Sequence, residues 1–488
     1  MLQHVYQVLF CFCKSQKCRE GYLRSRLAVL LVLLVADGSL LLPGCSHKVT
    51  SSLLPLEAPP EFTYTGEEPR SERWWTHFDD STLTQLVATG LDSNFSLLSA
   101  WQRFQAAQAV VDRESSYLLP DVEAFFTSGR SYPEPDFRGG ENQQVGLSAV
   151  YEVDLWGRIR SQVQAERYRA EATRRDYQAA VISLSAEITR TWYQLVAAQR
   201  QHALTLEQLE TNEDILQLII ARFGSGQIRG VDILRQKQLI EATREQEIIT
   251  ESQIETLEHQ LAVLTGQPPQ QTVSYATDSL PPLPPLPETG IPLELVQRRP
   301  DVQTAYYNLL TADREVASAI SARYPRLTLD ISASARSNEA ENLFRNWAYA
   351  LGANLLAPLF YGGRLNAEID RTRAVEQQFL YDYGQTVLVA FREVEDALIQ
   401  ERKQQDRLRV LQEQVSLAQR SNEQLRVEYF NGFGDYLAVL TAINQEQQLQ
   451  RDLISAKLML LDYRISLYRA LAGGVETEGN PPSRDSIE

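Results

Sequence analysis

The chain has 488 residues, 43% of them hydrophobic, and a formal net charge of −16. This composition is that of a folded protein and not of a disordered chain. A strongly acidic chain lacks the clustered Lys and Arg residues that release counterions from nucleic acid, so we predict no nucleic-acid partner.

The first segment of the chain is basic and leads into a short apolar run. Lys14, Lys17 and Arg26 are among its positive residues, and the run LAVLLVLLVA covers 27–36. A positive region before a short apolar core is typical of an export signal, and about ten apolar residues are too few for a membrane-spanning helix. We therefore predict a signal peptide over residues 1–44.

The predicted signal ends in LLPGCS, with Cys45 at its end. This pattern resembles the lipobox of bacterial lipoproteins. The resemblance implies cleavage before Cys45, diacylglycerol on the Cys45 thiol with palmitate among the lipids, and, because Ser46 follows, an outer-membrane destination. The alternative is an ordinary signal peptide with an incidental cysteine. Cys11, Cys13 and Cys18 lie in the leader, so we predict no disulfide within the mature chain.

The rest of the chain contains a duplication with an offset of 205–207 residues. SYLLPDVEAFF (116–126) is echoed by ARYPRLTLDIS (322–332), and RFGSGQIRGVDIL (222–234) by YFNGFGDYLAVL (429–440). Each copy predicts a helix, two strands, a very long helix and a second long helix. The predicted organisation is a lipidated N-terminal linker at 45–80, a first repeat at 81–279, an extended Pro-rich linker at 280–292, a second repeat at 293–473 and a disordered C-terminal tail at 474–488.

Alternating apolar and polar residues predict four strands of about ten residues, the length of a tilted membrane strand. They lie at 121–129, around 147–155, at 326–336 and at 349–359. A half-buried soluble sheet has the same alternation. We favour membrane strands because the chain after the signal has no apolar run near 18 residues. Four strands cannot close a barrel, whereas three chains together supply twelve.

The long helix predicted from Arg158 to Phe223 has apolar residues at steps of four and three, which is typical of a coiled coil. The predicted seam is Ile188, Trp192, Leu195, Gln199, His202, Leu206, Leu209, Glu213, Leu216, Ile220 and Phe223. The second copy has Val387, Phe391, Val394 and Leu398, then a register slip before Leu408, Leu411 and Val415. We interpret His202 as a packed interior residue and not as a metal ligand.

The chain shows no pattern typical of an enzyme. It lacks the Walker A, H-E-x-x-H and G-x-S-x-G motifs and any Cys/His cluster in the predicted mature part. The histidines His4, His47, His77, His202 and His259 are scattered. The pair Asp79-Asp80 precedes a predicted helix, where capping explains it. We predict neither a cofactor nor a metal site.

Three stretches resemble one known family: RWWTHFDDSTLTQLV (73–87), YEVDLWGRIR (151–160) and RRPDVQTAYYNLL (298–310). They resemble the TolC-like outer-membrane efflux factors, in the lipoprotein branch often called NodT-type. The resemblance implies a mainly α protein with a transmembrane β part. It implies a homotrimer whose twelve-stranded β-barrel, four strands from each chain, continues into a long periplasmic α-helical coiled-coil barrel. Trp156-Gly157 and Tyr361-Gly362 would then mark the junctions between barrel strand and tunnel helix, at the lipid interface.

The function that this resemblance implies is that of a passive exit duct for drugs or other small molecules. An inner-membrane pump of the resistance-nodulation-division class would drive export through a periplasmic adaptor. Two alternatives stay open: an outer-membrane channel for type I protein secretion, and a periplasmic coiled-coil adaptor that is itself a lipoprotein. An adaptor would lack the four amphipathic strands.

The adaptor docks, by the same resemblance, at the two turns between long helices. Gly224, Gly226, Gly432 and Gly434 mark these tip turns, and we expect positive φ angles there. Family members close the periplasmic mouth near this point with salt bridges and acidic rings. Asp435 is the candidate on the second turn and Asp232 on the first, although Gly434 stands where the family usually has an acid. The alternative is that both aspartates only favour helix N-termini through the dipole.

Overall fold

The computed structural model describes residues 56, 58–130, 141–269, 279–337 and 339–473, and it divides into two compact units. A sheet unit consists of Pro120–Arg160 and Ile320–Tyr361, and a helical unit contains the remaining described residues. The predicted signal peptide, Cys45 and the predicted C-terminal tail lie outside the described residues. Among the helices that the structure describes, none is both long enough and apolar enough to cross a membrane.

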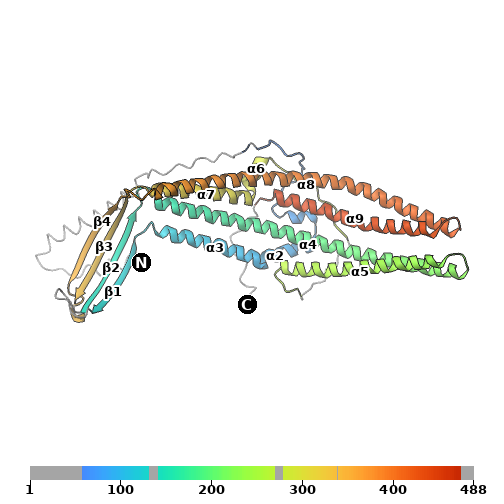
Figure 1. The fold of residues 1–488 in the computed structure, drawn as a ribbon, viewed down its shortest axis with the longest axis horizontal. Coiled ribbons are helices and arrows are strands. Elements are labelled where there is room, and N and C mark those ends of the chain that lie inside the picture. Colours follow the sequence, from blue (N-terminus) through green and yellow to red (C-terminus); the bar gives the residue numbers. More distant parts are fainter. Residues whose placement is uncertain (1–55, 57, 131–140, 270–278, 338, 474–488) are drawn as a thin grey trace. The chain divides into compact units, whose positions relative to one another are not determined.

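The sheet unit is a four-stranded antiparallel sheet with the strand order β1-β2-β3-β4 (Figure 1). Its elements are β1 Asp121–Arg130, β2 Glu141–Val153, β3 Arg326–Ser337, the short 3₁₀ helix η2 Ala340–Asn342 and β4 Trp347–Leu356. The four predicted strands are therefore confirmed. The predicted end of the last strand is wrong, because β4 stops at Leu356 and Leu359 lies beyond it. Likewise β2 stops at Val153, before Leu155.

The strand register reproduces the sequence duplication. In the first repeat Asp121 lies opposite Val150, and in the second Arg326 lies opposite Leu356. The residue numbers of β1 and β3 at equivalent places in the sheet differ by 205, and those of β2 and β4 differ by 206. These two differences are constant along both strand pairs. The two halves of the sheet are thus equivalent residue by residue.

The remaining elements are helices. In chain order they are η1 Trp74–Phe78, α2 Ser81–Ser93, α3 Phe95–Ser116, α4 Arg158–Gly224, α5 Gly230–Leu264, α6 Pro292–Arg298, α7 Pro300–Ser321, α8 Arg364–Phe430 and α9 Tyr436–Leu471. The predicted long helix from Arg158 to Phe223 is confirmed as α4, and α8 has the same length of 67 residues. The pairs α4/α5 and α8/α9 form two long hairpins with their turns at the same end of the helical unit (Figure 1).

The helical unit has an aromatic core where η1 meets α4 and α9. Trp74 is stacked on Tyr468 of α9, and Trp192 of α4 is fully buried in the same cluster. Trp192 donates its indole N–H to Asp80 Oδ2 at 2.7 Å, while Asp80 Oδ1 accepts the backbone N–H of Leu83 at 2.9 Å. The predicted capping role is thus confirmed for Asp80, which also ties the start of α2 to α4.

The coiled-coil seam of α4 is only partly where the apolar pattern places it. Ile188, Trp192 and Leu195 are buried as predicted, but Leu206, Ile220 and Phe223 are exposed on the isolated chain. The buried positions in this half are Leu204, Thr205, Gln208, Asn212, Ile215 and Ile219. The predicted seam is therefore wrong by about one position in the second half of the helix.

The predicted seam of α4 is wrong in this half because several of the buried side chains are polar. Asn212 donates to Thr243 Oγ1 at 3.1 Å and accepts from Gln447 Nε2 at 3.1 Å, and Gln208 donates to Gln450 Oε1 at 3.0 Å. Buried amides are stable when they bond to one another, and an apolar pattern does not reveal them. His202 is half-buried with Nδ1 3.2 Å from Thr250 Oγ1, as its interpretation as an interior residue predicts.

In α8 the predicted seam is confirmed except at Leu408, which is only half-buried. Val387, Phe391, Val394 and Leu398 are buried, and the predicted slip follows them. The buried positions Glu401 and Gln404 bridge the slip before the seam continues at Leu411 and Val415. Steps of three and three at this point, in place of four and three, change the register of the coiled coil.

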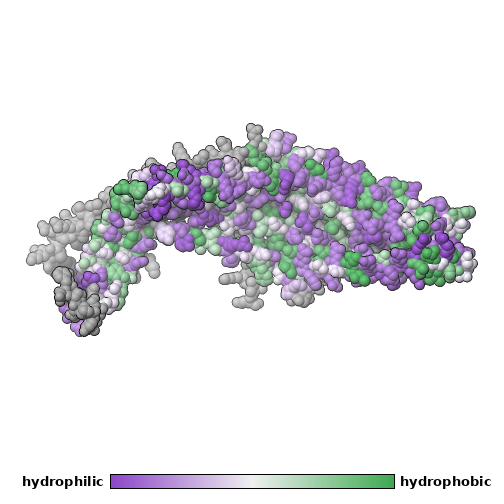
Figure 2. All heavy atoms as spheres, in the orientation of Figure 1, coloured by the Kyte–Doolittle hydropathy of each residue, from purple (hydrophilic) through white to green (hydrophobic). Residues whose placement is uncertain are grey.

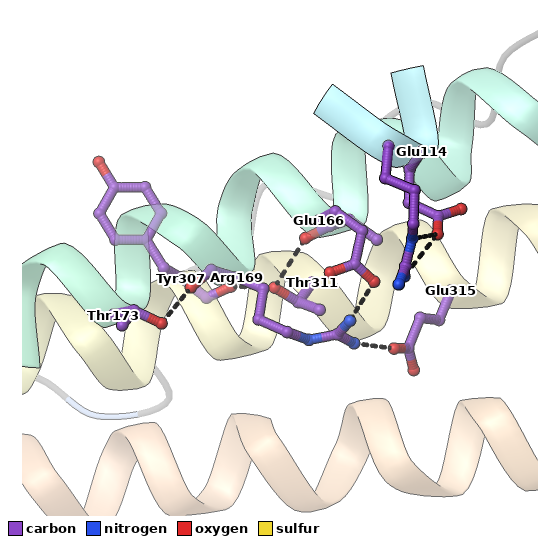
Figure 3. A network of polar contacts seen from close by, with 9 residues as sticks. Glu114, Glu166, Arg169, Thr173, Tyr307, Thr311 and Glu315 are labelled. Carbon is purple, nitrogen blue, oxygen red and sulfur yellow. Dashed lines mark hydrogen bonds and ion pairs between the residues drawn. The ribbon is translucent and has the colours of Figure 1, made fainter. Parts of the chain in front are cut away.

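A polar network joins α4 to α7 at the other end of the helical unit (Figure 3). Arg169 pairs with Glu166 on its own helix and with Glu315 of α7, the latter at 2.6 Å. Thr311 of α7 donates to the carbonyl of Tyr307 at 2.9 Å. Because the ion pairs of Arg169 lie at the surface, we expect them to add little stability. Thr311, in contrast, is buried.

Candidate functional site

One face of the sheet is apolar over most of its length. The strand register places every second residue on this face, and its apolar members are Val122, Ala124, Phe126, Val145, Leu147, Ala149, Tyr151, Val153, Leu327, Leu329, Ile331, Ala333, Ala335, Trp347, Tyr349, Leu351, Ala353 and Leu355. Ser128, Gln143 and Ser337 continue the same face at the end of the sheet next to the β1–β2 turn. Many of the large apolar side chains are exposed on the isolated chain, with Leu351 at 73%. A continuous apolar face with this exposure needs an apolar surrounding.

The opposite face is largely polar. It presents Asp121, Glu123, Gln144, Ser148, Glu152, Thr328, Asp330, Ser332, Ser334, Arg336 and Asn354. Phe125, Val150 and Leu356 are large apolar exceptions on this face. Phe125 packs over Gly146, where an added Cβ would lie 2.8 Å from its ring. The sheet therefore has the two faces that a membrane strand needs, one for lipid and one for water.

The sheet has two open edges. Among the described residues, β1 pairs only with β2 and β4 pairs only with β3. In an apolar surrounding the free backbone N–H and C=O groups of an edge strand cost several kcal/mol each. The sheet is thus incomplete as a single copy.

The junction between β2 and α4 is held by an aromatic clasp. Trp156 donates its indole N–H to the carbonyl of Pro325 at 2.8 Å and stacks on Tyr324 with ring centroids 4.9 Å apart. Gly157 follows with φ of 76°, a left-handed conformation that glycine adopts without strain. Asp154 then accepts the backbone N–H groups of Ile159 and Arg160 at 3.1 and 2.9 Å, and so caps the start of α4.

The second junction, before α8, has a different geometry. Gly362 and Gly363 both have positive φ, 58° and 84°, and α8 begins at Arg364. Gly157 and Gly363 each stand directly before the helix, so Gly363 and not Gly362 is the structural equivalent of Gly157. The sequence comparison missed Gly363 because it aligned Trp156 with Tyr361. That these residues lie at a lipid interface stays a prediction.

The tip turns use two of the four predicted glycines for the reversal. Gly226 and Gly432 have φ of 76° and 83°. Gly224 is the last residue of α4, and Gly434 has no positive φ. The expectation of positive φ is therefore confirmed for Gly226 and Gly432 and wrong for Gly224 and Gly434. One left-handed residue after each helix is enough to end it.

The two candidate aspartates differ in exposure and share an arginine. Asp435 is exposed, and its Oδ1 lies 3.4 Å from Arg229 Nη2. Asp232 is buried, at 3% exposure, with its oxygens 3.8 Å from Arg229 and 3.7 Å from Arg235. Asp435 occupies the N-cap position of α9, but its side chain accepts no capping hydrogen bond. Asp435 therefore faces the neighbouring hairpin and not its own helix.

Further contacts join the two tips. Arg222 at the end of α4 donates to the carbonyl of Phe430 at 2.7 Å, so a cation sits at the C-terminus of α8. Tyr436 is buried, and its hydroxyl donates to Gln236 of α5. Burial raises the pKa of Tyr436 far above its ordinary range, because the phenolate would be desolvated. The apolar cluster around these residues is Ile215, Ile219, Leu239, Tyr429, Tyr436, Val439 and Ile443.

The tips also present apolar side chains. Phe433 on the α8–α9 turn is 87% exposed, and Leu234 near the start of α5 is exposed as well. Polar residues predominate on the visible face of the long helices in Figure 2. No group of His, Asp or Glu within the described ranges is arranged to hold a metal ion.

A sequence model of one protein family, described as outer membrane efflux protein, matches residues 86–267 and 291–473. The chain belongs to the outer membrane efflux protein family. Each matched stretch contains two strands of the sheet and one long hairpin. The prediction of a TolC-like efflux factor is therefore confirmed.

Curated relatives agree with this membership. The pyoverdine export outer membrane protein OpmQ of Pseudomonas aeruginosa is 31% identical over 90% of this chain and 96% of its own length. The toluene efflux pump outer membrane protein TtgF of Pseudomonas putida is 29% identical over 84% of this chain and 87% of its own.

Solved structures show the same fold. The outer-membrane channel OprN superposes with a TM-score of 0.80 at 28% identity, over 86% of this chain and 98% of that one. The outer membrane protein VceC of Vibrio cholerae has a TM-score of 0.76 at 23% identity, over 83% of this chain and 99% of that one, and supports the fold alone. The predicted fold class is confirmed.

Membership in this family indicates where the protein lies and what its role is. Family members are trimeric outer-membrane channels of tripartite efflux pumps. This efflux protein lies in the outer membrane and extends into the periplasm, and its role is transport. The two-faced sheet is the part suited to the membrane.

Proposed function

We propose that three copies of this chain form one channel, each supplying β1–β4 to a shared twelve-stranded barrel. The observation that carries the proposal is the sheet with one apolar face, one polar face and two open edges. The exposed apolar residues Leu206, Ile220 and Phe223 of α4 support it, because neighbouring hairpins would cover them. Native mass analysis of the protein extracted in mild detergent tests this. A folded monomer as the only species would overturn it.

We propose further that the channel carries small organic molecules in a tripartite pump. The relatives support this, since their names describe pyoverdine export and toluene efflux. The partners would be a periplasmic adaptor and an inner-membrane transporter of the resistance-nodulation-division class. In a strain without its own channel, this chain should restore resistance to organic solvents when its cognate adaptor and pump are co-expressed. Restoration of protein secretion alone would instead favour type I secretion.

The adaptor would dock at the tip turns. Phe433 is the most exposed large apolar side chain there, and an exposed aromatic ring at a helix turn is suited to a protein contact. Co-purification of the cognate adaptor with Phe433→Ser tests this assignment. Phe95→Ser is the matched control, because Phe95 is also exposed but begins α3. Equal recovery of adaptor with both variants would contradict tip docking through Phe433.

The periplasmic mouth would be held closed at the same tips. The pair Arg229–Asp435 and the bond from Arg222 to Phe430 O link the two hairpins, and the cluster around Tyr436 packs beneath them. An exposed ion pair contributes less than about 1 kcal/mol, so most of the closing free energy would come from the packed cluster. Asp435 is the gate residue, and buried Asp232 orients Arg229.

The N-terminal part would add a lipid anchor. Residues 1–44 would be removed, Cys45 would carry the lipid, and 45–80 would link it to the first repeat. The barrel spans the membrane without this anchor, so lipidation would be an additional attachment. Incorporation of labelled fatty acid into the mature protein tests the assignment.

A further inference from the structure

A short extended segment before η1, residues 62–70, is fastened to other parts of the helical unit and is called the strap below. It begins 17 residues after Cys45. We propose that the strap is the fixed end of a tether of limited length, whose other end is the lipid on Cys45. This inference rests on the proposed lipid anchor and barrel, and it adds the place where the anchor is attached to the folded chain.

The start of the strap is bound to α8. The ring of Phe62 is buried and packs edge-on against Phe391, with ring centroids 6.4 Å apart. The next residue, Thr63, donates its backbone N–H to Glu395 Oε1 at 2.9 Å. Phe391 and Glu395 lie one turn apart on α8, so two successive strap residues are held by one short stretch of this helix.

The second half of the strap is bound to the Pro-rich linker. The backbone N–H of Gly66 donates to the carbonyl of Pro287 at 3.1 Å, and that of Glu288 donates to the carbonyl of Glu68 at 2.8 Å. A Cβ atom on Gly66 would lie 1.8 Å from the carbonyl oxygen of Leu286. The two segments are therefore so close that only glycine fits at position 66.

The strap runs along α8 away from the start of that helix. Phe62 contacts Phe391, whereas two residues later the ring of Tyr64 lies 4.6 Å from the guanidinium carbon of Arg402. Arg402 is 11 residues further along α8 than Phe391. The chain therefore enters the strap from the side where α8 begins at Arg364.

The tether is only slightly longer than the distance that it has to cover. The sheet unit ends at Tyr361 and α8 begins at Arg364, so the start of α8 marks the membrane surface in the proposed barrel. Phe391 is 27 residues further, about 40 Å along the helix axis. The 17 residues from Cys45 to Phe62 can reach at most about 56–61 Å. The reserve is the length of about five extended residues.

Shortening the tether while keeping the strap tests this inference. Deletion of residues 47–55 keeps Cys45 and Ser46 and removes no strap residue, but the remaining chain reaches at most about 26–29 Å. Both ends then cannot stay in place. The acyl chains bury many methylene groups in lipid, so we expect the strap to leave α8 and the linker first.

Trypsin cleavage after Arg70 reports whether the strap is bound. In the intact chain the Arg70 side chain is 18% exposed and pairs with Glu294 at 3.2 Å. Release of the strap should expose this bond. Mass analysis after trypsin treatment of open outer-membrane fragments should show at least tenfold more chain beginning at Ser71 in the deletion variant than in the wild type.

Three further variants separate length, sequence and lipid. Replacement of residues 47–55 by nine Gly and Ser residues keeps the length and should leave cleavage at the wild-type level. Deletion of residues 47–50 alone leaves a reach of about 43–47 Å and should also be tolerated. The longer deletion combined with Cys45→Ser has no lipid to hold the tether, so cleavage should return to the wild-type level.

The outcomes distinguish the tether from the proposals on which it rests. Wild-type cleavage in the acylated, trimeric 47–55 deletion would overturn the tether. Raised cleavage that persists after Cys45→Ser would overturn it as well, because the deleted residues would then hold the strap themselves. If the deletion prevents trimer formation, recovery with Cys45→Ser would support the tether and continued loss would overturn it. Wild-type protein without labelled fatty acid, or without trimers, would overturn the proposed anchor or the proposed barrel instead.

Discussion

Arg464 of α9 forms a bidentate ion pair with Glu401 of α8 in the interior of the helical unit. Nε donates to Oε2 at 2.7 Å and Nη2 to Oε1 at 2.6 Å, with both side chains at most 4% exposed. Nη1 donates to the carbonyl of Pro285 at 2.6 Å. One guanidinium thus joins α8, α9 and the Pro-rich linker between the repeats, at the point where the seam of α8 slips.

Removal of one partner of this pair should destabilise the protein strongly. Glu401→Gln leaves a buried cation with a weaker acceptor, and we expect the free energy of unfolding to fall by about 3–5 kcal/mol. Thermal unfolding of the detergent-extracted protein measures this. Asp406→Asn, which removes the exposed partner of Arg409, is the control and should change stability by less than about 1 kcal/mol. An equal loss of stability in the two variants would show that the buried pair contributes no more than an exposed one.

The two faces of the sheet should respond differently to a charge. Leu351→Arg places a cation on the apolar face and should cost about 2–4 kcal/mol near the membrane midplane. Ala350→Arg, one residue earlier on the polar face, should be tolerated. The amount of trimer in outer-membrane fractions measures both. A greater loss with Ala350→Arg would mean that the lipid and water faces are reversed.

The exposed pair at the tips should govern ion selectivity more than stability. Asp435→Asn removes one acid per copy and leaves Arg229 without this partner, so the mouth becomes more positive. We expect lower cation selectivity in bilayer recordings and weaker block by trivalent cations. Glu423→Gln removes the same charge from α8 outside the turn and should change both less. Unchanged selectivity and block with Asp435→Asn would reduce Asp435 to a residue that favours the start of α9.

The packed cluster at the tips should limit leakage through the mouth. Tyr436→Ala removes a buried ring and should cost about 3–5 kcal/mol locally. The loosened tips should raise channel conductance and make cells sensitive to large antibiotics. Tyr436→Phe keeps the ring and loses only the bond to Gln236, about 1 kcal/mol, so it should leak little. If Tyr436→Ala kept wild-type conductance in a normal trimer, the cluster would not contribute to closing.

Cys45→Ser should abolish labelling by fatty acid. The trimer should stay in the outer membrane, because the barrel spans it independently of the anchor. Metabolic labelling together with membrane fractionation measures both properties. Labelling of the variant at the wild-type level would contradict the lipobox assignment, whereas loss of the protein from the membrane would show that the anchor is needed for insertion.

The sequence alone determined the elements and their periodicities. Alternation over residues 326–336 predicted β3 and its two faces, because period two is a local property of a strand. The duplication was also visible in the sequence, and its offset agrees with the register of the strand pairs β1–β2 and β3–β4. The family resemblance, carried by short motifs, also needed no coordinates.

Only the tertiary structure decided which side chains meet. In the second half of α4 the buried seam contains Gln208 and Asn212 and not the predicted apolar positions. The burial of these two amides depends on polar partners from other helices. The structure also showed that Asp435 reaches Arg229, which lies on the other hairpin and about 200 residues away in the chain, and not the start of its own helix. It ended β4 at Leu356, because a strand needs a neighbour to bond to. A local pattern fixes what a segment can form, whereas its boundaries and pairings depend on the segments that pack against it.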